Sequence, residues 1–388
     1  MSDPTRMTAI PPRSASGSSS APSRDVLTKA AEVGRRDIQS ALNFLAQFGG
    51  PPAQAAGNIL LANHFLQSEE RWLHHLNLYL HPYGISPIEL KGPKRDRFFR
   101  LHSTPPNYVE DGPLVSIIMP AFNAEETVET ALRSLLAQSW RNIEIIVIDD
   151  KSSDRTNQIV KTLAKQDGRI RVFRNPANIG PYGSRNLAVT QSHGMFITTH
   201  DADDWAHPQR IEMQVSAIRD HQLAGVVMRA IRMTKKGEFS QLGNDGTPES
   251  HDGVLKTSHV SAMFLKEDFD KRLGSWDTVR FAADSELLSR SKIAFGERFA
   301  EFAKPTLIYF DNPTSLTNNP RSGFINGALS PVRLKYRQHW SAWHDALDTS
   351  KDTYMPFPQQ NRPFEAPDAM KVPAENVEQC RAKFDGSA

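Results

Sequence analysis

The sequence has a single cysteine, no long hydrophobic run and almost no net charge. Because Cys380 has no second cysteine to pair with, an internal disulfide and a multi-cysteine metal site are both excluded. No stretch approaches the roughly 18 consecutive apolar residues of a membrane-spanning helix, and no apolar signal segment opens the chain. These absences predict a cytoplasmic protein and leave open peripheral contact with the inner face of a membrane.

The charge balance argues against a nucleic-acid partner. Lysine and arginine number 46 against 44 aspartates and glutamates, a formal charge of +2. Residues 1–24 contain three arginines and one aspartate and so account for this +2, which leaves the remainder neutral. A generic nucleic-acid binder needs a basic field that this chain lacks. At about 150 residues per domain, 388 residues predict two to three structural units.

The ends of the chain differ from its middle. Residues 1–24 are rich in Ser and Pro and poor in large apolar side chains, which predicts a disordered tail. Residues 25–100 show helical apolar spacing, interrupted at Gly49-Gly50-Pro51-Pro52, and their two-sided apolar content predicts docking on a neighbouring domain. The basic stretch 91–112 is either a solvated linker or a contact for an anionic substrate or membrane. Residues 331–388 are expected to form a helix and an irregular tail.

Strand and helix patterns alternate between these ends. Short apolar runs predict strands at 114–119, 143–148, 170–173 and 195–199. Helices are expected between them, the first starting at Asn123 with Glu126 completing a capping box. This alternation predicts an α/β fold with a mostly parallel, Rossmann-like sheet. In such sheets ligands bind outside the carboxyl ends of the strands.

Carboxylates follow two of these strands. Asp149 and Asp150 end the second strand, and Asp201, Asp203 and Asp204 follow the fourth. We expect all five to converge on one sheet edge, where their repulsion requires a compensating cation. A hard divalent metal such as Mg²⁺ or Mn²⁺ takes oxygen ligands and commonly bridges to phosphate. Asp201 and Asp203 are the expected metal ligands, whereas Asp204 is equally suited to capping a loop.

Four motifs in this region occur in a recognisable order. They are Val115–Asn123, Asp149–Asp154, Asn178-x-Gly180 followed by Arg185-Asn186, and Asp201-Ala202-Asp203-Asp204. In this respect residues 114–218 resemble the family 2 glycosyltransferases, and the resemblance continues more weakly over 219–330. It implies a GT-A fold at 113–330 with an N-terminal helical extension. It also implies a nucleotide-sugar donor with UDP-sugars as the expected class, a Mg²⁺ or Mn²⁺ ion, and inversion at the anomeric carbon.

The resemblance also assigns roles on the donor side. Asp150 would accept a hydrogen bond from the base, and Arg185 would lie near the nucleotide. Asp201 would reach the ribose or the metal, and Asp203 would ligate the metal. The walls of the nucleoside pocket would be Pro120, Phe122 and Glu125. Phe122 replaces a Tyr that is frequent in the family, which removes a hydroxyl but keeps the stacking face.

The acceptor side is assigned in the same way. The stretch 273–287 is similar to the family's acceptor motif, although many relatives have Glu-Asp where this chain has Ala283-Asp284. Asp284 matches the catalytic base, and it could also cap a helix. Further candidates are Asp277 and Glu286 as substitute bases, Trp276 as a sugar platform or a core residue, and His259 as a contact for the diphosphate, metal or acceptor.

The resulting hypothesis is a glycosyltransferase that acts on a saccharide, a lipid-linked glycan or another hydroxyl acceptor in surface polysaccharide or glycoconjugate synthesis. The alternative is a non-catalytic nucleotide-sugar-binding or scaffold subunit of a glycan assembly complex. A sugar-nucleotide pyrophosphorylase and a dinucleotide-binding dehydrogenase both need glycines after the first strand. Residues 121–124 read Ala-Phe-Asn-Ala, so neither is favoured.

Overall fold

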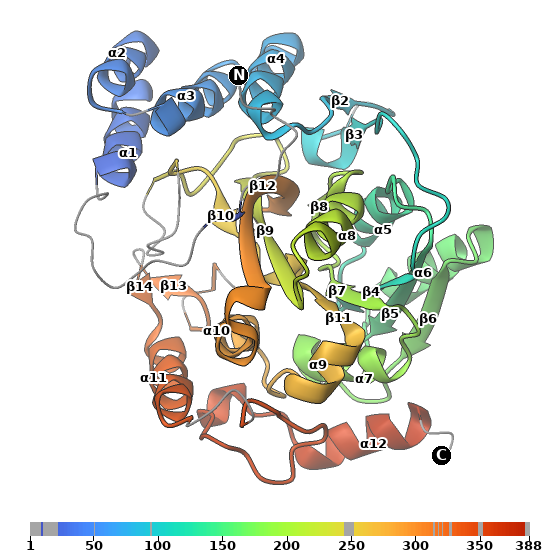
Figure 1. Ribbon diagram of the computed structural model, residues 1–388. Helices are drawn as coiled ribbons and strands as arrows, with labels where there is room; N and C mark the ends of the chain where they lie inside the picture. Colours follow the sequence, from blue (N-terminus) through green and yellow to red (C-terminus); the bar gives the residue numbers. More distant parts are fainter. Residues whose placement is uncertain are drawn as a thin grey trace.

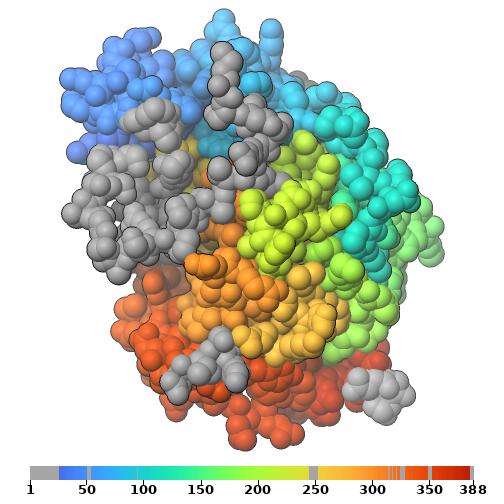
Figure 2. All heavy atoms as spheres, in the orientation of Figure 1, coloured from blue at the N-terminus to red at the C-terminus, as the bar shows by residue number. Residues whose placement is uncertain are grey.

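The structure, a computed structural model, surrounds a central twisted sheet with helices (Figure 1). The described residues are 9–10, 22–49, 51–93, 95–243, 252–312, 315–316, 318–319, 321–325, 328–347 and 352–384. In the space-filling view, N-terminal atoms (blue) and C-terminal atoms (red) lie at opposite ends of the central region (Figure 2). None of the described helices is long and apolar enough to cross a membrane.

Four parallel strands form the first half of the sheet. In spatial order they are β7 (Phe196–Thr199), β4 (Val115–Ala121), β5 (Ile143–Asp149) and β6 (Ile170–Arg174). The connecting helices are α5 (Val128–Leu136), α6 (Thr156–Gln166) and α7 (Gly180–Thr190). Every residue of β4 and β5 is buried, as expected for strands covered by helices on both faces. The chain runs from β4 through β5 to β6 on one side and then places β7 on the other side of β4. The ends of β4 and β7 therefore form a topological switch point, the place where ligands bind in sheets of this type.

The second half of the sheet extends beyond β7. Strand β11 (Met263–Leu265) lies antiparallel between β7 and β9 (Gly225–Met233), and β12 (Phe299–Phe310) runs parallel to β9. Shorter strands β8 (Trp205–Ala206) and β10 (Lys256–Thr257) pair with β12 and β9. The helices of this half are α8 (Arg210–Asp220), α9 (Lys266–Arg272) and α10 (Ala283–Phe295). The expected α/β class with a largely parallel sheet is therefore confirmed.

The loop after β4 differs from the expectation. Asn123 does not start a helix, because its φ is 48° and α5 begins only at Val128. Its Oδ1 accepts a hydrogen bond from the Ser153 N–H at 2.9 Å, and its own N–H donates to Ser152 Oγ at 3.0 Å. Asn tolerates this left-handed conformation better than most residues. The predicted capping box is replaced by a link between the loops that follow β4 and β5.

The N-terminal part contains more order than predicted. Much of the expected disordered tail lies outside the described residues, but Ala9–Ile10 form β1 on the edge of β12, and α1 begins at Pro22. A sheet edge offers unpaired backbone groups, so even a short segment can pair there. The elements that follow are α1 (Pro22–Gly34), α2 (Ile38–Phe48), α3 (Pro51–His64), α4 (Glu69–Leu80), η1 (His81–Tyr83), β2 (Ile88–Leu90), η2 (Arg97–Arg100) and β3 (Leu101–Ser103).

The N-terminal helices dock on the sheet domain, as predicted. Trp72 of α4 is fully buried; its Nε1 donates to the Gly237 carbonyl at 2.8 Å, and its ring stacks on Phe239. The Tyr79 hydroxyl donates to Asp252 Oδ2 at 2.7 Å. These contacts join segments about 170 positions apart, since the sequence separations are 165 and 173. The helices therefore share a core with β9 and β12.

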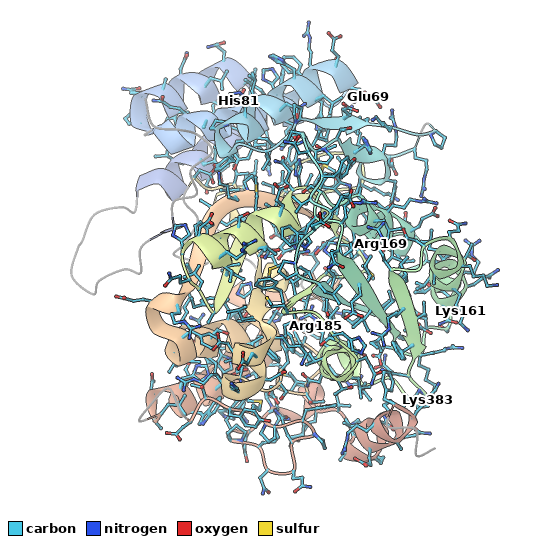
Figure 3. All side chains as sticks on the ribbon, turned by 45° about the vertical axis from the view of Figure 1, so that its right-hand side comes forward. Glu69, His81, Lys161, Arg169, Arg185 and Lys383 are labelled. Atoms are coloured by element: carbon cyan, nitrogen blue, oxygen red, sulfur yellow. The ribbon has the colours of Figure 1, made fainter. Side chains whose placement is uncertain are left out.

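Part of the basic stretch 91–112 is built into the fold and is not a solvated linker. Arg97 is buried, donates to the Lys236 carbonyl at 3.0 Å and lies over the Trp72 ring. Arg100 forms an ion pair of 2.6 Å with Glu69, which Figure 3 shows on α4. Both arginines therefore have partners within the protein, and their contacts join the N-terminal helices to the hairpin of β2 and β3.

We expect Trp72→Ala to lower the free energy of unfolding by about 3–5 kcal/mol, because it empties a fully buried indole site and removes its hydrogen bond. Leu78→Ala on the same helix, at a position that is 45% exposed, should change it by only about 0.5 kcal/mol. Equilibrium denaturation in urea compares the two. Equal effects would show that α4 is not part of the cooperative core.

The C-terminal part packs against the sheet domain from the opposite end. It contains β13 (Phe324–Ile325), β14 (Ala328–Leu329), α11 (Pro331–Asp345), η5 (Asp368–Met370) and α12 (Ala374–Phe384). On α12, Cys380 is buried and Phe384 stacks on Phe173 at 5.3 Å between ring centroids. Lys383, labelled in Figure 3, donates to the Arg174 carbonyl at 2.8 Å. The region expected to be irregular therefore ends in a helix seated against α7 and β6.

Candidate donor and acceptor site

Three carboxylates meet directly after β7. The side chains of Asp201, Asp203 and Asp204 each place one oxygen within 4.8 Å of the others. Asp204 is buried and accepts a hydrogen bond from the Phe310 N–H at 3.2 Å, so β12 fixes this end of the loop. Asp201 and Asp203 are half-buried. The predicted Asp-x-Asp pair is thus brought together at the switch point beside β4.

The other two strand-end carboxylates, at the end of β5, lie at the same edge of the sheet, as expected, but are not part of this cluster. Asp149 forms an ion pair of 2.9 Å with Arg174. Asp150 directly follows β5 and accepts hydrogen bonds from the turn that precedes α7. Because β4 separates β5 from β7, residues at the ends of these two strands cannot share one ion-sized site.

A buried arginine, Arg210, holds the end of β7, from which the carboxylate loop extends. Arg210 donates through Nη2 to Thr198 Oγ1 and to the Thr199 carbonyl, both at 2.8 Å, and its Nη1 lies 3.1 Å from His200 Nδ1. Burial lowers the pKa of Arg210 to about 10, and burial together with this arginine lowers the pKa of His200 well below its usual range. Both residues therefore fix the end of β7.

The carboxylate cluster resists full ionisation. Burial, with Asp201 adding its charge, raises the pKa of Asp203 to about 6. Burial and the neighbouring carboxylates raise the pKa of Asp204 well above its usual range. A bound cation would relieve this repulsion. Three clustered carboxylates are the oxygen donors that Mg²⁺ and Mn²⁺ prefer, so the residues present fit a hard divalent ion.

Arg185 of α7, labelled in Figure 3, forms an ion pair with Asp201 of this cluster. Its side chain is 2% exposed, and its Nη2 bonds to Asp201 Oδ1 at 2.5 Å. Its Nε and Nη1 are buried and find no hydrogen-bond partner among the described residues. Buried donors are nearly always satisfied in native proteins. The unsatisfied face of this guanidinium is therefore suited to an anion, such as a phosphate, that enters the site.

The expected nucleoside-pocket residues lie in β4 and in the loop that follows it. Phe122 is 52% exposed, an unusual position for a phenyl ring and one that leaves its face available. Pro120 is buried within β4. Glu125 forms an ion pair of 3.0 Å with Arg155, so its carboxylate is held at the rim.

Asp150 has an internal role that the sequence did not predict. Its two carboxylate oxygens accept hydrogen bonds from Asn175 Nδ2 at 2.8 Å, the Ile179 N–H at 3.0 Å and the Gly180 N–H at 2.8 Å. Burial raises its pKa even though these donors oppose the shift. Asp150 thereby fixes the turn that begins α7, and its contact with a base stays a prediction.

On the acceptor side, Asp284 stands in the first turn of α10. Ala282, with a φ of 72°, occupies the N-cap position, so Asp284 is not the helix cap. Burial opposes ionisation of Asp284, but His259, Arg185 and Arg333 outweigh it and lower its pKa. The carboxylate is therefore ionised at neutral pH and can accept a proton. Since Arg185 acts on both Asp201 and Asp284, the donor and acceptor sides are adjacent.

The two substitute bases are occupied by other partners. Asp277 is 1% exposed, pairs with Arg362 and accepts a hydrogen bond from the Tyr336 hydroxyl at 2.8 Å. Glu286 is fully buried with Arg290 at 2.7 Å, and a His344 ring nitrogen lies 3.1 Å from the same oxygen. Buried pairs of this kind hold a fold together. Asp284 forms no such ion pair with any residue that the structure describes, so it remains the candidate base.

Trp276 is a core residue and not a sugar platform. It is 3% exposed and lies 5.2 Å from Phe269 between ring centroids, so its faces are not available to a sugar. Its backbone N–H and carbonyl both bond to the Asn186 side chain at 2.9 Å. His259 is half-buried beside Asp284. The hydrogen bonds of Asn186 to Trp276 and the electrostatic effect of Arg333 on Asp284 were not predicted. Both join segments that are far apart in the sequence, and no local pattern marks such contacts.

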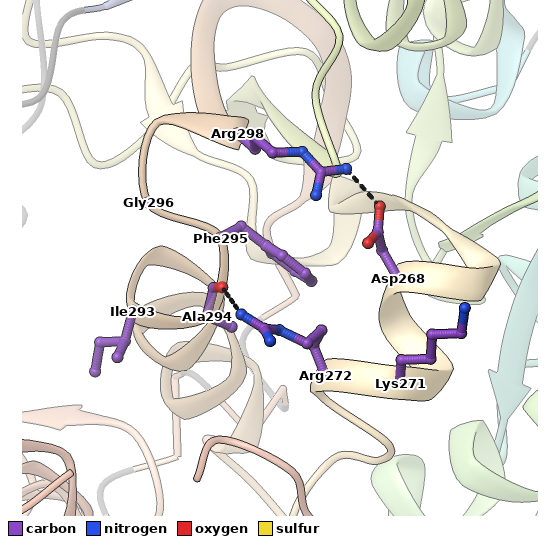
Figure 4. Close-up of a pocket in the computed structure, with 8 residues that line it drawn as sticks. All are labelled: Asp268, Lys271, Arg272, Ile293, Ala294, Phe295, Gly296 and Arg298. Carbon is purple, nitrogen blue, oxygen red and sulfur yellow. Dashed lines mark hydrogen bonds and ion pairs between the residues drawn. The ribbon is translucent and has the colours of Figure 1, made fainter. Parts of the chain in front are cut away.

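A second hollow of about 530 Å³ lies between α9 and the end of α10 (Figure 4). It contains none of the predicted site residues. Asp268 and Arg298 pair across it at 2.7 Å, and Arg272 donates to the Ala294 carbonyl at 3.2 Å. Its charged rim is thus largely neutralised by its own contacts.

The comparisons with known proteins agree with this geometry. Residues 116–265 match the model of the family described as Glycosyl transferase family 2. The matched residues extend from β4 to β11, and the sheet described above has the GT-A fold. The resemblance drawn from the motifs is confirmed.

Several individual proteins are similar to the chain. It is 30% identical over 230 residues to the uncharacterized glycosyltransferase EpsJ of Bacillus subtilis, which covers 54% of this chain and 64% of that protein. It is 40% identical over 114 residues to the UDP-Glc:alpha-D-GlcNAc-diphosphoundecaprenol beta-1,3-glucosyltransferase WfgD of Escherichia coli, which covers 29% of this chain and 44% of that protein. In both cases the chain spans less than two thirds of the relative.

A solved structure of S. aureus TarS, residues 1–349, in complex with UDP-GlcNAc aligns with 18% identity and a TM-score of 0.43. The alignment covers 52% of this chain and 59% of that chain.

Proposed function

We propose that this protein is a glycosyltransferase that moves a sugar from a nucleoside-diphosphate donor to a hydroxyl acceptor with inversion. The observation that carries this proposal is the carboxylate cluster of Asp201, Asp203 and Asp204 beside the unsatisfied guanidinium of Arg185. Carboxylates alone would repel a diphosphate, so this pairing suits a diphosphate that arrives with a divalent cation.

On the donor side, Asp203 and Asp201 are the residues that would hold a Mg²⁺ or Mn²⁺ ion. Such an ion supplies positive charge that stabilises the diphosphate as a leaving group. Arg185 contributes its own Nε–H and Nη1–H groups as donors to the phosphate oxygens. The nucleoside would lie against Phe122, with the contacts proposed for Pro120, Glu125 and Asp150 around it.

On the acceptor side, Asp284 would take the proton of the attacking hydroxyl. A carboxylate placed opposite the leaving diphosphate lets the hydroxyl attack from the far face of the sugar, which inverts the anomeric carbon. His259 and Arg333 keep this carboxylate ionised until it accepts the proton. Since Asp277 and Glu286 are occupied by buried partners, Asp284 is the base best supported by the geometry.

The expected donor class is a UDP-sugar, and the expected acceptor is a saccharide or a lipid-linked glycan. Support comes from WfgD, whose name gives UDP-Glc as donor and a diphosphoundecaprenol-linked sugar as acceptor. The corresponding setting is surface polysaccharide or glycoconjugate synthesis, at the cytoplasmic face of a membrane.

The test is a panel of nucleotide-sugars, screened for thermal stabilisation with Mn²⁺ and then for transfer of the labelled sugar. A donor that binds the native state raises its apparent stability in proportion to occupancy. Stabilisation with transfer supports the proposed enzyme. Binding without transfer to any acceptor offered would instead favour the non-catalytic subunit.

Removing divalent cations is expected to abolish transfer, because the clustered carboxylates and the diphosphate would then face each other without counter-charge. Activity after exhaustive treatment with EDTA, and again after addition of Mn²⁺ or Mg²⁺, measures this. Full activity in the chelated protein would contradict a metal-dependent mechanism.

A further inference from the structure

The loop that leads into Asp284 is bonded to a distant part of the chain. This loop comprises residues 273–283, and its partner is the C-terminal segment 352–371. At the start of the loop, the Ser275 hydroxyl donates to the Met355 carbonyl at 2.9 Å, and the Met355 N–H donates to the Leu273 carbonyl at 2.9 Å. The C-terminal segment thus supplies backbone partners to residues about 80 positions earlier, the Ser275–Met355 separation being 80.

The far end of the loop is held in the same way. The Arg280 N–H donates to the Met370 carbonyl at 2.9 Å, and Val279 forms an isolated antiparallel bridge with Lys371. Arg280 also donates through Nη1 to Asn178 Oδ1 at 2.9 Å. The C-terminal segment therefore follows the loop along its length rather than touching it at one point.

A buried ion pair fastens the middle of the loop. Asp277 is 1% exposed, and Nη2 of Arg362 contacts both of its carboxylate oxygens. The Tyr336 hydroxyl from α11 donates to the same carboxylate at 2.8 Å. A buried carboxylate without its cation is strongly unfavourable, so the loop keeps this position only while Arg362 is present.

On its opposite side the loop rests on α7. Asn186 bonds to both backbone groups of Trp276, and it follows Arg185 in the sequence. Ala282 has a φ of 72° directly before α10, a conformation that costs free energy for a residue with a side chain. A strained backbone conformation persists only where contacts on either side hold the chain in place. The contacts between the loop and segment 352–371 hold it here.

We propose that the C-terminal segment 352–371 sets the position of Asp284, with Arg362 as the positioning residue that acts through Asp277. This inference rests on the proposed function, in which Asp284 is the base. Arg362 touches neither donor nor acceptor in this arrangement. Its role is to keep the carboxylate of Asp284 within reach of the acceptor hydroxyl.

The test compares Arg362→Gln, Arg362→Lys and the matched control Arg298→Gln. Arg298 also pairs with an aspartate, Asp268, but at the surface hollow shown in Figure 4. Arg362→Gln should lower kcat about 10- to 100-fold, the scale expected when a catalytic group is displaced by about 1 Å. Its donor Kd, measured by titration calorimetry, should stay within about twofold of the wild type, since the donor side is untouched. Arg362→Lys should recover most of kcat, and Arg298→Gln should behave as the wild type.

Each outcome separates this inference from the proposed function. A wild-type protein that binds donor but transfers no sugar would refute the proposed function itself. If the wild type transfers and Arg362→Gln keeps its kcat within twofold, the positioning role is wrong. Loss of donor affinity in parallel with kcat, without recovery by lysine, would also overturn it, because the pair would then support the fold in general.

Discussion

Asp284→Asn is expected to lower kcat by about 10²–10⁴-fold and to leave donor affinity nearly unchanged. The amide has the size of the carboxylate but cannot take a proton at neutral pH. Because the interaction is needed in the transition state and not in the bound ground state, the loss should fall on kcat. His259, Arg185 and Arg333 lower the pKa of Asp284, so protonation of this carboxylate should reduce wild-type activity only at pH values below the usual aspartate range.

Initial rates and donor titration on the same preparation decide this prediction. Asp220→Asn, an exposed carboxylate at the end of α8, is the matched control and should match the wild type. Transfer by Asp284→Asn at near wild-type rate would place the base elsewhere. Asp277 and Glu286 would then be the next residues to substitute, despite their buried partners.

Asp203→Asn is expected to reduce transfer by orders of magnitude and, at the same time, to stabilise the metal-free protein. The first effect follows from loss of a carboxylate ligand to the cation that accompanies the diphosphate. The second follows from the repulsion within the cluster, which the neutral amide relieves. Unlike Asp284→Asn, this variant should also lose the metal-dependent part of donor binding.

The stability effect has a definite pH dependence. The pKa of Asp203 is raised to about 6 in the fold from an ordinary value of 3.8, so between these values the native state binds more protons than the unfolded state. Deprotonation of Asp203 should therefore lower the free energy of unfolding of the metal-free wild type as the pH rises from about 4 to about 6. Above about pH 6 this contribution should stay low. Thermal unfolding with EDTA at pH 4.5 and 7.5 tests it. Asp203→Asn should gain more at pH 7.5 than at 4.5, and equal gains would contradict the prediction.

The strands of the first half-sheet could be predicted because each is a short apolar run bounded by clear breaks. Val115–Ala121 and Ile143–Asp149 are examples, and both lie where local pattern placed them. The carboxylate cluster could be predicted in part, since Asp201 and Asp203 follow one strand. That β4 separates Asp149 and Asp150 from this pair could not be predicted, because strand order is set by sheet topology, which the local pattern does not contain.

Other features depend on contacts between remote segments. Trp276 could be assigned to a sugar platform or to the core, and only its position against Phe269 decides for the core. Arg333 lies in α11, a region outside the recognised motifs, yet it acts on Asp284. The same is true of the pair Asp277 and Arg362, which are 85 positions apart. No periodicity or motif encodes such pairs.

The adjacency of Arg185 and Asn186 has a practical consequence for redesign. These neighbours on the 11-residue helix α7 contact different parts of the candidate site. Arg185 bonds to Asp201, and Asn186 bonds to the backbone of Trp276. A chimera that imports only residues 273–283 from a relative would set a foreign loop against this Asn. Acceptor specificity should therefore be exchanged as a module made of α7, the loop and segment 352–371, and grafts of the loop alone are expected to fail.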